Sequence, residues 1–405
     1  MLLKSLLYKI KRPYHFVKTG LLGGLLAQIR YKFPEKKLKI ICITGTDGKT
    51  TTATLLYYIL KNSGKKTALI TTVAAYIADE TLDVGLHTTT PHPKILYKLM
   101  RKMLSQDIEY LVLEMTSHGA YQYRNWGIKP LVAGITNVSS EHLDYHLNYK
   151  KYLGAKALIL KNAKLAIIND DDQSSTTLKK CLKSKRLSTY SSKDRLYSAL
   201  QKAVNIRFPQ DYNQMNAKLA ISIAKQLGIE TKILIKAIET FPGVKGRMEK
   251  VPNNRKIDIF VDFAHTANAI RESLLFLQKH IKTKKANAKV IALFGSAAER
   301  DIFKRPIMGK YAGELADLVV LTSDDAREED IWSMIRQVKS DLGENHSKII
   351  SIADRKTAIS FTLNKLARAG DAVALFGKGH EQSISIGKVE YPWDEVKVVK
   401  EILNQ

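Results

Sequence analysis

The strongest sign of chemistry is a glycine-rich turn at residues 44–51, TGTDGKTT, between an apolar run and a helical pattern. Glycines let backbone N–H groups face phosphate oxygens, and a helix N-terminus adds positive potential. Lys49 would reach the outer phosphates, and the Thr50 hydroxyl would hold Mg²⁺. The turn predicts a nucleotide site, although Ile43 replaces the first glycine of the full Walker pattern. The residues expected to bind the nucleotide here are Gly45, Thr46, Asp47, Gly48, Lys49, Thr50 and Thr51.

A second candidate is Glu114, which begins the stretch EMTSH at the end of another apolar run. In an open parallel sheet, a carboxylate at the carboxyl end of a strand lies beside the phosphate loop. Such a position suits a Mg²⁺ ligand. The alternative is that Glu114 caps the helix that follows.

A third candidate is the stretch TNVSSEHLDYH at residues 136–146, which also follows an expected strand. Its two histidines and two carboxylates could hold a metal, and the alternative is a pair of surface histidines. These residues are Glu141, His142, Asp144 and His146. The next helix carries Lys156 among apolar neighbours. A lysine on such a face usually extends to solvent, whereas a buried one near Mg²⁺ would need neutralisation or chemical modification.

These candidates need a scaffold, and the hydrophobic pattern predicts one in which strands and helices alternate. Expected strands are residues 38–43, 67–73, 110–115, 131–136 and 165–169, and expected helices include 50–62 and 149–161. This alternation indicates a parallel sheet covered on both faces. We therefore expect an α/β fold with a central P-loop ATP-binding domain at residues 39–243.

The alternation restarts after about residue 246. Expected strands are residues 257–262, 290–294, 318–321 and 372–376, and expected helices are 266–282, 306–315, 330–342 and 355–369. This part has no phosphate loop of its own. Turn residues cluster at Pro242 and Gly243, which favours a boundary there. We expect residues 244–405 to form a second, Rossmann-like α/β domain.

Charge and composition narrow the classes of function. Of 405 residues, 65 are Lys or Arg and 39 are Asp or Glu, so the net charge is +26. This excludes an acidic solvating protein and points to anionic partners such as nucleotides, nucleic acid or a membrane surface. The two cysteines, Cys42 and Cys181, cannot form a disulfide scaffold, which favours a reducing cytosol. No apolar run of about 18 residues predicts a membrane span.

Residues 1–38 form a basic arm in which apolar and aromatic side chains are interleaved. No small-residue cleavage site follows a clean apolar core, so we do not expect a signal peptide. Residues 21–29 could form a short apolar helix that a glycine pair weakens. The arm is either a helix packed on the body of the protein or a membrane-surface helix, because basic and apolar faces together suit anionic lipid.

Several stretches in this order resemble the Mur ligases, and among them the MurE type. They are GTDGKT at 45–50, EMTSH at 114–118, NVSSEHLDYH at 137–146, YLGAK at 152–156, GRME at 246–249, DFAHT at 262–266, KRPIMG at 304–309 and GKGHE at 377–381. The resemblance runs from about residue 39 to residue 405. It implies a ligase in which ATP phosphorylates a carboxylate and an amine then displaces phosphate to form an amide. The implied acceptor is a muramoyl-dipeptide precursor of peptidoglycan, and the implied amine is meso-diaminopimelate or lysine.

The resemblance also implies roles for individual residues. Lys49 would neutralise phosphate charge, while Thr50, Glu114 and His142 would bind Mg²⁺. Lys156 would be carbamylated, which turns an ammonium into an anion able to support a second Mg²⁺. On the nucleotide side the matching positions are Asn213, Asn216, Arg247 and Asp262.

Substrate residues carry over in the same way. Those expected to contact the muramoyl dipeptide are Thr89, Thr90, Pro91, Thr116, Gln122 and Arg124, with Arg124 as the carboxylate clamp. Those expected on the side of the amino acid are His265, Arg300, Asp324, Asp325, Arg327, Gly377 and Glu381. The family's Asp-Asn-Pro-Arg motif reads DDAR at 324–327, and the stretch GSAAE at 295–299 is altered too. The arginine favours meso-diaminopimelate over lysine, and the lost asparagine and proline leave the amino acid open.

The largest departure from the family is at the front, where the 38 residues of the arm leave no room for the usual UDP-binding domain. The arm could still provide a surface for a UDP-linked substrate, or the acceptor could be lipid-linked or lack UDP, with the arm touching the membrane. An alternative within the ligases is a folylpolyglutamate-type enzyme, against which residues 89–91 and 377–381 argue. A nucleic-acid-binding protein is supported only by the charge, so we expect no nucleic acid partner. We expect a cytoplasmic monomer, with peripheral membrane contact through the arm as an open alternative.

Overall fold

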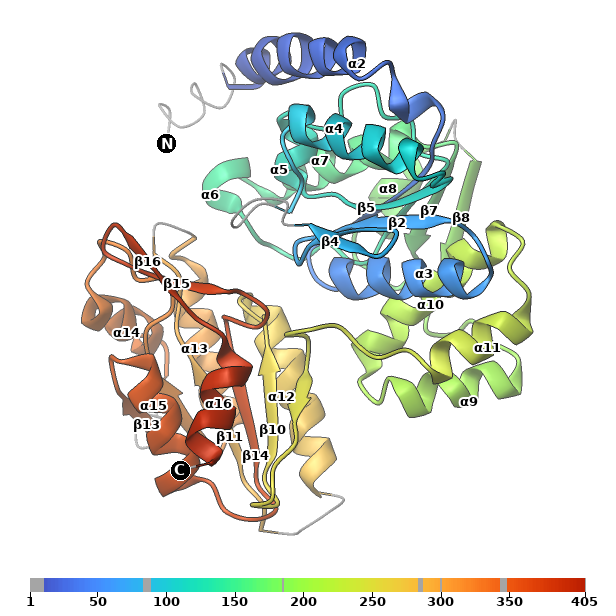
Figure 1. Ribbon diagram of the computed structural model, residues 1–405. Coiled ribbons are helices and arrows are strands. Elements are labelled where there is room, and N and C mark those ends of the chain that lie inside the picture. Colours follow the sequence, from blue (N-terminus) through green and yellow to red (C-terminus); the bar gives the residue numbers. More distant parts are fainter. Residues whose placement is uncertain are drawn as a thin grey trace. The chain divides into compact units, whose positions relative to one another are not determined.

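The computed structural model describes residues 11–82, 89–183, 186–282, 287–298, 301–342 and 348–404. The chain divides into two compact units, residues 1–242 and residues 243–405 (Figure 1). Each unit has its own sheet and its own hydrophobic core.

The first unit is built on one mixed sheet whose central strands are buried apolar runs, as expected for a sheet covered on both faces. Within the described residues eight strands pair in the order β4-β3-β2-β5-β1-β6-β7-β8, and only the β2-β3 and β3-β4 pairs are antiparallel. The strands are β1 (Lys39–Thr44), β2 (Thr67–Ile70), β3 (Ala75–Ile77), β4 (Glu80–Leu82), β5 (Tyr110–Glu114), β6 (Val132–Ile135), β7 (Leu165–Asn169) and β8 (Arg186–Tyr190).

The register of the central strands brings three strand ends together. Ile43 on β1 lies opposite Glu114 on β5, and Thr44 on β1 lies opposite Ile135 on β6. Because these strands are parallel, the loops after β1, β5 and β6 leave the same edge of the sheet. Those loops carry the candidate residues of the first unit.

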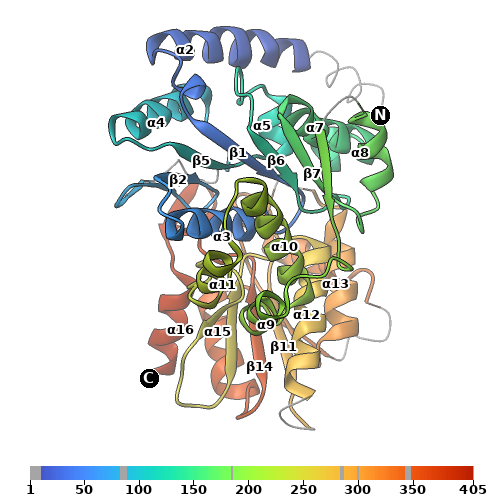
Figure 2. The same ribbon diagram turned by 90° about the vertical axis from the view of Figure 1, so that its right-hand side faces the viewer.

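Helices cover both faces of this sheet (Figures 1 and 2): α3 and α10 lie on one face, and α4, α5, α7 and α8 on the other. The helices are α3 (Lys49–Asn62), α4 (Pro93–Ser105), α5 (Ser117–Tyr121), α6 (Leu143–His146), α7 (Tyr149–Asn162), α8 (Ser175–Cys181), α9 (Ser198–Arg207), α10 (Asp211–Gln226) and α11 (Thr231–Glu239). The arm contributes a π-helical stretch η1 (Phe16–Leu25), then α2 (Leu26–Arg30) and a short turn η2 (Pro34–Lys36), and it packs along α4.

The second unit contains another largely parallel sheet, with the order β13-β12-β11-β14-β10-β9 among its described residues. Its strands are β9 (Glu249–Val251), β10 (Asp258–Asp262), β11 (Val290–Phe294), β12 (Leu318–Leu321), β13 (Ile349–Ser351) and β14 (Ala372–Phe376), followed by the hairpin β15 (Ser383–Ile386) and β16 (Val389–Pro392). Its helices are α12 (Ala267–Lys282), α13 (Lys304–Leu315), α14 (Ile331–Lys339), α15 (Arg355–Phe361), η4 (Thr362–Leu366) and α16 (Glu395–Leu403).

The α/β class predicted from the sequence is confirmed, with differences in detail. The strand expected at 67–73 ends at Ile70, where the chain turns into the antiparallel strand β3. The helix expected at 355–369 becomes α15 followed by the π-turn η4. The short helix expected at 21–29 is part of a longer helical stretch that runs from residue 11 to residue 30. In the part of the chain that the structure describes, no helix is long and apolar enough to cross a bilayer.

Candidate active site

The turn at residues 45–48, here called the phosphate loop, requires its glycines. Gly45 has φ +146°, and a Cβ there would lie 1.8 Å from Thr136 Oγ1. Gly48 has φ +79°, and a Cβ there would lie 2.1 Å from Asn216 Oδ1. Positive φ and the close approach of neighbours both exclude larger residues. The sequence therefore folds this loop tightly against β6 and α10.

Hydrogen bonds from the loop after β6 fix the phosphate loop. The amide of Thr46 donates to the Asn137 carbonyl at 2.9 Å, and the amide of Asp47 donates to Asn137 Oδ1 at 3.0 Å. The Thr136 hydroxyl donates to the Asp47 carbonyl at 2.6 Å. From α7, the hydroxyl of the buried Tyr152 lies 3.1 Å from Thr46 Oγ1. These contacts therefore fix the conformation of the phosphate loop.

Glu114, the last residue of β5, contacts the first turn of α3, as the metal-ligand interpretation requires. Its buried carboxylate accepts hydrogen bonds from Thr50 Oγ1 at 3.0 Å and from the Thr72 amide at 3.2 Å. The cap of the following helix α5 is instead Thr116, whose hydroxyl accepts from the Gly119 amide. The capping alternative for Glu114 is therefore wrong. A hydroxyl and a carboxylate in contact supply the hard oxygen ligands that Mg²⁺ prefers.

Lys156 is buried, so the interpretation of a lysine extending to solvent is wrong. Only 1% of its surface is exposed, its Nζ donates to the Gly45 carbonyl, and it lies 4.4 Å from the centre of the Tyr152 ring. Burial and the nearby Lys49 lower the pKa of Lys156 well below its usual value, although three carboxylates act in the opposite direction. A neutral amine is the form that can react with carbon dioxide.

The four residues of the 141–146 stretch do not converge on one point. His146 is fully buried with Nε2 3.1 Å from Ser117 Oγ, and burial, with His118 and Lys156, lowers its pKa to about 3. His142 faces His118, with ring centres 4.7 Å apart, and its ring lies 6.2 Å from that of Tyr152. Among the described residues, the one set of three His, Cys, Asp or Glu side chains close enough for a metal lies elsewhere, in the second unit. A metal site made of all four residues is therefore not supported.

The residues predicted to hold the muramoyl dipeptide do come together; Thr90, Thr116, Gln122 and Arg124 are here called the acceptor group. Arg124 donates from Nη1 to the Thr90 carbonyl at 2.6 Å and from Nε to Gln122 Oε1 at 2.9 Å. The hydroxyls of Thr90 and Thr116 are 3.2 Å apart, and Gln122 donates to the Tyr145 hydroxyl at 3.0 Å. Burial lowers the pKa of Arg124, but guanidinium groups remain charged in proteins.

Thr72 connects Glu114, beside the phosphate loop, to Thr89, which precedes Thr90 of the acceptor group. Its hydroxyl lies 3.1 Å from Glu114 Oε1 and 3.0 Å from the hydroxyl of Thr89. Pro91, two residues further on, is buried. The chain therefore runs continuously from the carboxylate beside the phosphate loop to the acceptor group.

The two asparagines expected near the adenine lie on α10, one turn apart. Asn216 is buried against Gly48, and its Nδ2 donates to Asn213 Oδ1 at 3.1 Å. Asn213 donates in turn to Gln210 Oε1 at 3.2 Å. The first turn of α10 is thereby oriented on the phosphate loop.

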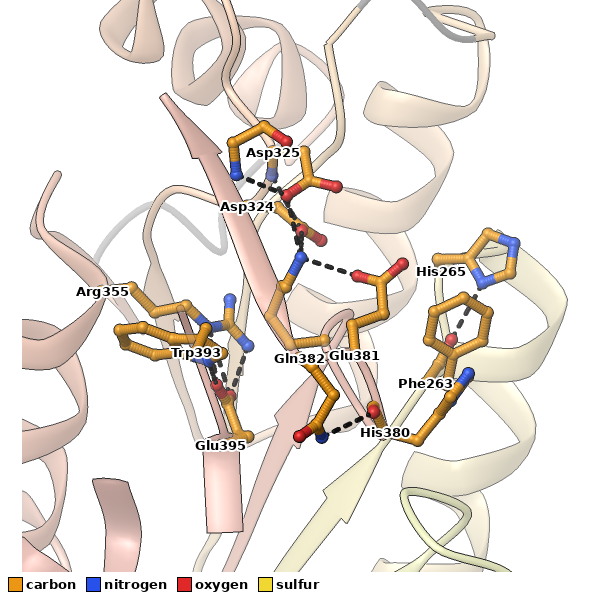
Figure 3. A network of polar contacts seen from close by, with 12 residues as sticks. Phe263, His265, Asp324, Asp325, Arg355, His380, Glu381, Gln382, Trp393 and Glu395 are labelled. Atoms are coloured by element: carbon orange, nitrogen blue, oxygen red, sulfur yellow. Dashed lines mark hydrogen bonds and ion pairs between the residues drawn. The ribbon is translucent and has the colours of Figure 1, made fainter. Parts of the chain in front are cut away.

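In the second unit, a buried lysine gathers three of the predicted residues (Figure 3). The Nζ of Lys378 lies 2.8 Å from Asp325, 2.6 Å from Glu381 and 3.7 Å from Asp324; these four residues are here called the lysine cluster. Gly377 has φ +108°, and a Cβ there would lie 2.5 Å from Asp324 Oδ2. Burial alone would lower the pKa of Lys378, but the three carboxylates raise it above its usual value. Burial raises the pKa of Asp324.

A buried ion pair lies next to the lysine cluster (Figure 3). Arg355 and Glu395 are 2.6 Å apart, and both are at most 1% exposed. Arg355 also donates to the carbonyls of Ser323 and Phe376, the residues just before Asp324 and Gly377. The pair therefore positions both strand ends that carry the cluster.

Arg247, Asp262 and His265 form another group in the second unit. The Asp262 carboxylate accepts from the amides of Met248 and Ala264, both at 2.6 Å. The Arg247 guanidinium lies 4.5 Å from the centre of the Phe263 ring, and His265 Nδ1 lies 2.8 Å from the Phe263 carbonyl. His265 thus lies with the residues predicted for the nucleotide side.

The remaining predicted residues lie apart from this group. Arg327 has φ +46°, and its amide donates to the carbonyl of Ser385, whose own amide donates to Asp325. It therefore flanks the lysine cluster. Arg300 lies outside the described residues.

Sequence reasoning missed five residues that hold the predicted ones in place. They are Thr72, Asn137, Tyr145, Tyr152 and Lys378. Four of them lie within motifs on which the family resemblance rests, so their positions in the sequence could have indicated a role at the site. Thr72 carries no such signal, because only the fold brings it to Glu114.

Comparisons with known proteins identify the family. The Mur ligase middle domain matches residues 43–234, and the Mur ligase glutamate ligase domain matches residues 246–379. UDP-N-acetylmuramoyl-L-alanyl-D-glutamate–2,6-diaminopimelate ligase of Clostridium botulinum is 32% identical over 402 residues, which cover 94% of this chain and 81% of that relative. The ligase of the same name from Aquifex aeolicus is 34% identical over 390 residues, with 92% and 78% covered.

Solved structures give the same result. A UDP-N-acetylmuramoyl-L-alanyl-D-glutamate–2,6-diaminopimelate ligase superposes with a TM-score of 0.60 at 26% identity and covers 95% of this chain and 82% of its own. Folylpolyglutamate synthase of Mycobacterium tuberculosis superposes with a TM-score of 0.70, covering 89% and 92%, and its 16% identity shows the shared fold alone. The family resemblance predicted from the sequence is confirmed: the chain belongs to the Mur ligase family and is a ligase.

Proposed function

We propose that the protein uses ATP to join meso-diaminopimelate to the free carboxylate of a muramoyl dipeptide. The observation that carries this proposal is the contact chain through Thr72, which links Glu114 beside the phosphate loop to Thr89 and the acceptor group. The names of the relatives supply the acceptor and the amino acid. These contacts support the proposal because they would bring the triphosphate of ATP close to the carboxylate of the acceptor.

Charge neutralisation is the main task of the first unit. ATP and the acceptor carboxylate are both anions, so cationic groups must offset their repulsion before a phosphoryl group can be transferred. Lys49 begins α3, where the helix N-terminus also favours phosphate. Arg124 would hold the acceptor through paired N–H donors. The acceptor carboxylate would then attack the terminal phosphorus, and ADP would leave.

The residues around the phosphate loop fit Mg²⁺. Thr50 and Glu114 are already in contact, Lys156 lies against the Gly45 carbonyl, and His142 is the further ligand that we propose. When bound, Mg²⁺ would neutralise phosphate charge and polarise the transferred group. In its neutral form, the amine of Lys156 could add to carbon dioxide to give a carbamate and one released proton, and this carbamate would support a second ion.

The lysine cluster suits the incoming amino acid. meso-Diaminopimelate carries two amino and two carboxyl groups, so it needs both acidic and basic partners. Asp324, Asp325 and Glu381 surround a single ammonium, which leaves an excess of negative charge for the amino groups. Arg327 beside the cluster would take the distal carboxylate. The amine would attack the acyl phosphate, form the amide and release phosphate.

The test is amine-dependent release of ADP by the purified full-length chain. Reactions contain UDP-linked or lipid-linked muramoyl dipeptide, with meso-diaminopimelate, lysine or glutamate as the amine. We expect ADP release with meso-diaminopimelate and at least one of the two muramoyl acceptors. Comparison of the two acceptors shows which carrier the enzyme accepts. Release with glutamate and a pteroyl acceptor, but with no muramoyl acceptor, would instead support the folylpolyglutamate-type alternative and refute the proposal.

A further inference from the structure

The helical arm turns its small and polar residues toward the body of the protein and leaves its large apolar residues exposed. A helix on the surface of a soluble protein normally does the reverse. Between residues 11 and 30, its buried residues are small or polar: Thr19, Gly20, Gly24, Ala27 and Gln28. Its exposed apolar residues Val17, Leu21, Leu22, Leu25, Leu26 and Ile29 are here called the apolar face. Leu22, Leu26 and Ile29 are 53%, 60% and 56% exposed. A surface helix normally turns its apolar stripe inward, so this face is built for a partner.

Close packing fixes the orientation of the helix. A Cβ on Gly20 would lie 2.6 Å from the Trp126 ring, and a Cβ on Gly24 would lie 2.5 Å from Trp126 Cβ. The ring of Phe16 meets Trp126 edge-on, with centres 5.5 Å apart. Only the glycine side can approach the body this closely, so rotation of the helix cannot hide the apolar face.

The charge around the apolar face identifies the partner. Residues 1–34 contain no Asp or Glu, and the first acidic residue, Glu35, is buried and accepts a hydrogen bond from Gln28. Exposed cationic side chains lie toward both ends of the helix: Lys11, Arg12, Lys18, Arg30 and Lys32. Basic residues that flank an apolar face, with the exposed Tyr14 near one end, match an anionic lipid surface. Two copies docked through this face would bring like charges together, which disfavours self-association.

We propose that residues 11–30 dock the protein on an anionic membrane surface, with the apolar face in the interfacial region. The proposal goes beyond the ligase activity and does not depend on it. Two residues that pack against the helix belong to the segment that carries the acceptor group: Tyr123 lies between Gln122 and Arg124 in the sequence, and Trp126 follows two residues after Arg124. Docking would therefore place the acceptor group next to the lipid surface.

The first test is sedimentation of the full-length protein with vesicles. Phosphatidylcholine vesicles that contain phosphatidylglycerol should pull the protein down at low salt, while pure phosphatidylcholine should retain much less. The variant Leu22→Gln/Leu26→Gln/Ile29→Gln should lower the partition coefficient about tenfold or more, because three large apolar groups no longer leave water. The control is Ile206→Gln on α9, since Ile206 is 72% exposed and lies outside the arm.

The second test measures depth. Relative to wild type, which has three tryptophans of its own, brominated lipid in the same vesicles should quench the additional fluorescence of a Leu22→Trp variant and not that of an Ile206→Trp variant. Failure of the wild-type protein to sediment with anionic vesicles would overturn the proposal. Unchanged sedimentation of the triple glutamine variant would also overturn it, as would a dimer that this variant abolishes without any vesicle binding. Circular dichroism melts should match across the variants, because the substituted side chains are exposed.

Discussion

Two buried lysines, one in each unit, show how the same side chain acquires opposite chemistry. Lys156 and Lys378 are 1% and 0% exposed. In the described structure no carboxylate lies within ion-pair distance of Lys156, which donates to a backbone carbonyl. Lys378 touches three carboxylates. The pKa is lowered at Lys156 and raised at Lys378.

The difference shows that burial alone does not decide the protonation state. Burial always penalises the ammonium, and close carboxylates can reverse that penalty. Lys156, next to the phosphate loop, therefore releases its proton at lower pH than an exposed lysine does. Lys378 remains a cation and holds acidic groups together. We propose that the first lysine is the one that is modified, while the second organises a binding site.

The largest expected effect is on turnover. Lys156→Ala should lower the rate of ADP release about 100- to 1000-fold, because it removes the group that we propose to support Mg²⁺. The protein should remain folded, because the substitution removes an amine whose burial is unfavourable when it is charged. Steady-state kinetics and a circular dichroism melt measure the two quantities.

The control for this variant is Lys161→Ala, an exposed lysine of the same helix, which should keep the wild-type rate. A small added carboxylate such as formate should partly restore Lys156→Ala and leave Lys161→Ala unaffected. Activity of Lys156→Ala within a few fold of wild type would contradict the carbamate role.

The next effect is on stability. Lys378→Met should reduce the free energy of unfolding by about 3–5 kcal/mol at neutral pH, because it leaves buried carboxylates without their cation. Urea denaturation measures the loss. Lys388→Met is the matched control, since Lys388 pairs with Glu328 where both side chains are exposed, and it should change stability little. A similar small change in both variants would show that the lysine cluster is not held by charge.

A smaller effect is expected in the pH dependence of stability, which should differ between the two lysines. The unfolded state keeps Lys156 protonated up to about its usual pKa of 10.5, while the native state releases that proton at lower pH. Wild type should therefore gain stability over Lys156→Met as pH rises toward 10.5, by at most about 1.4 kcal/mol per pH unit. Because the pKa of Lys378 is raised, wild type should lose stability relative to Lys378→Met only above 10.5. Urea midpoints in carbon-dioxide-free buffers measure both, and parallel pH profiles would contradict the comparison.

The sequence predicts the phosphate loop well because local backbone demands determine it. Gly45 and Gly48 are required by positive φ and by close neighbours, and both requirements leave a signature in residue type. The strand ends that carry Glu114 and Asn137 follow from the strand–helix alternation. The α/β class was predictable for the same reason, whereas short edge strands such as β3 and β4 have too few residues for a clear pattern.

The environment of each lysine was not predictable from its neighbours in sequence. Lys156 lies on a helix whose pattern also fits a lysine that extends to solvent, and only the packing of α7 on the sheet buries it. Lys378 meets Asp325, which lies 53 positions earlier in the sequence, so its partners depend on the order of β12 and β14 in the sheet. The arm shows a similar limit, because close contact at its glycines, and not its apolar pattern, decides which face is buried.

The smallest expected effect tests how Lys156 is held. Tyr152→Phe keeps the ring beside the Lys156 ammonium or amine and removes only the hydroxyl that meets Thr46. Stability should fall by about 1 kcal/mol, as for the loss of one neutral hydrogen bond. The KM for ATP should rise a few fold because the phosphate loop loses one of its contacts, while the kcat should stay near that of wild type. A fall in kcat as large as that of Lys156→Ala would mean that the Tyr152 hydroxyl, and not the environment of the lysine, controls the chemistry on this side of the phosphate loop.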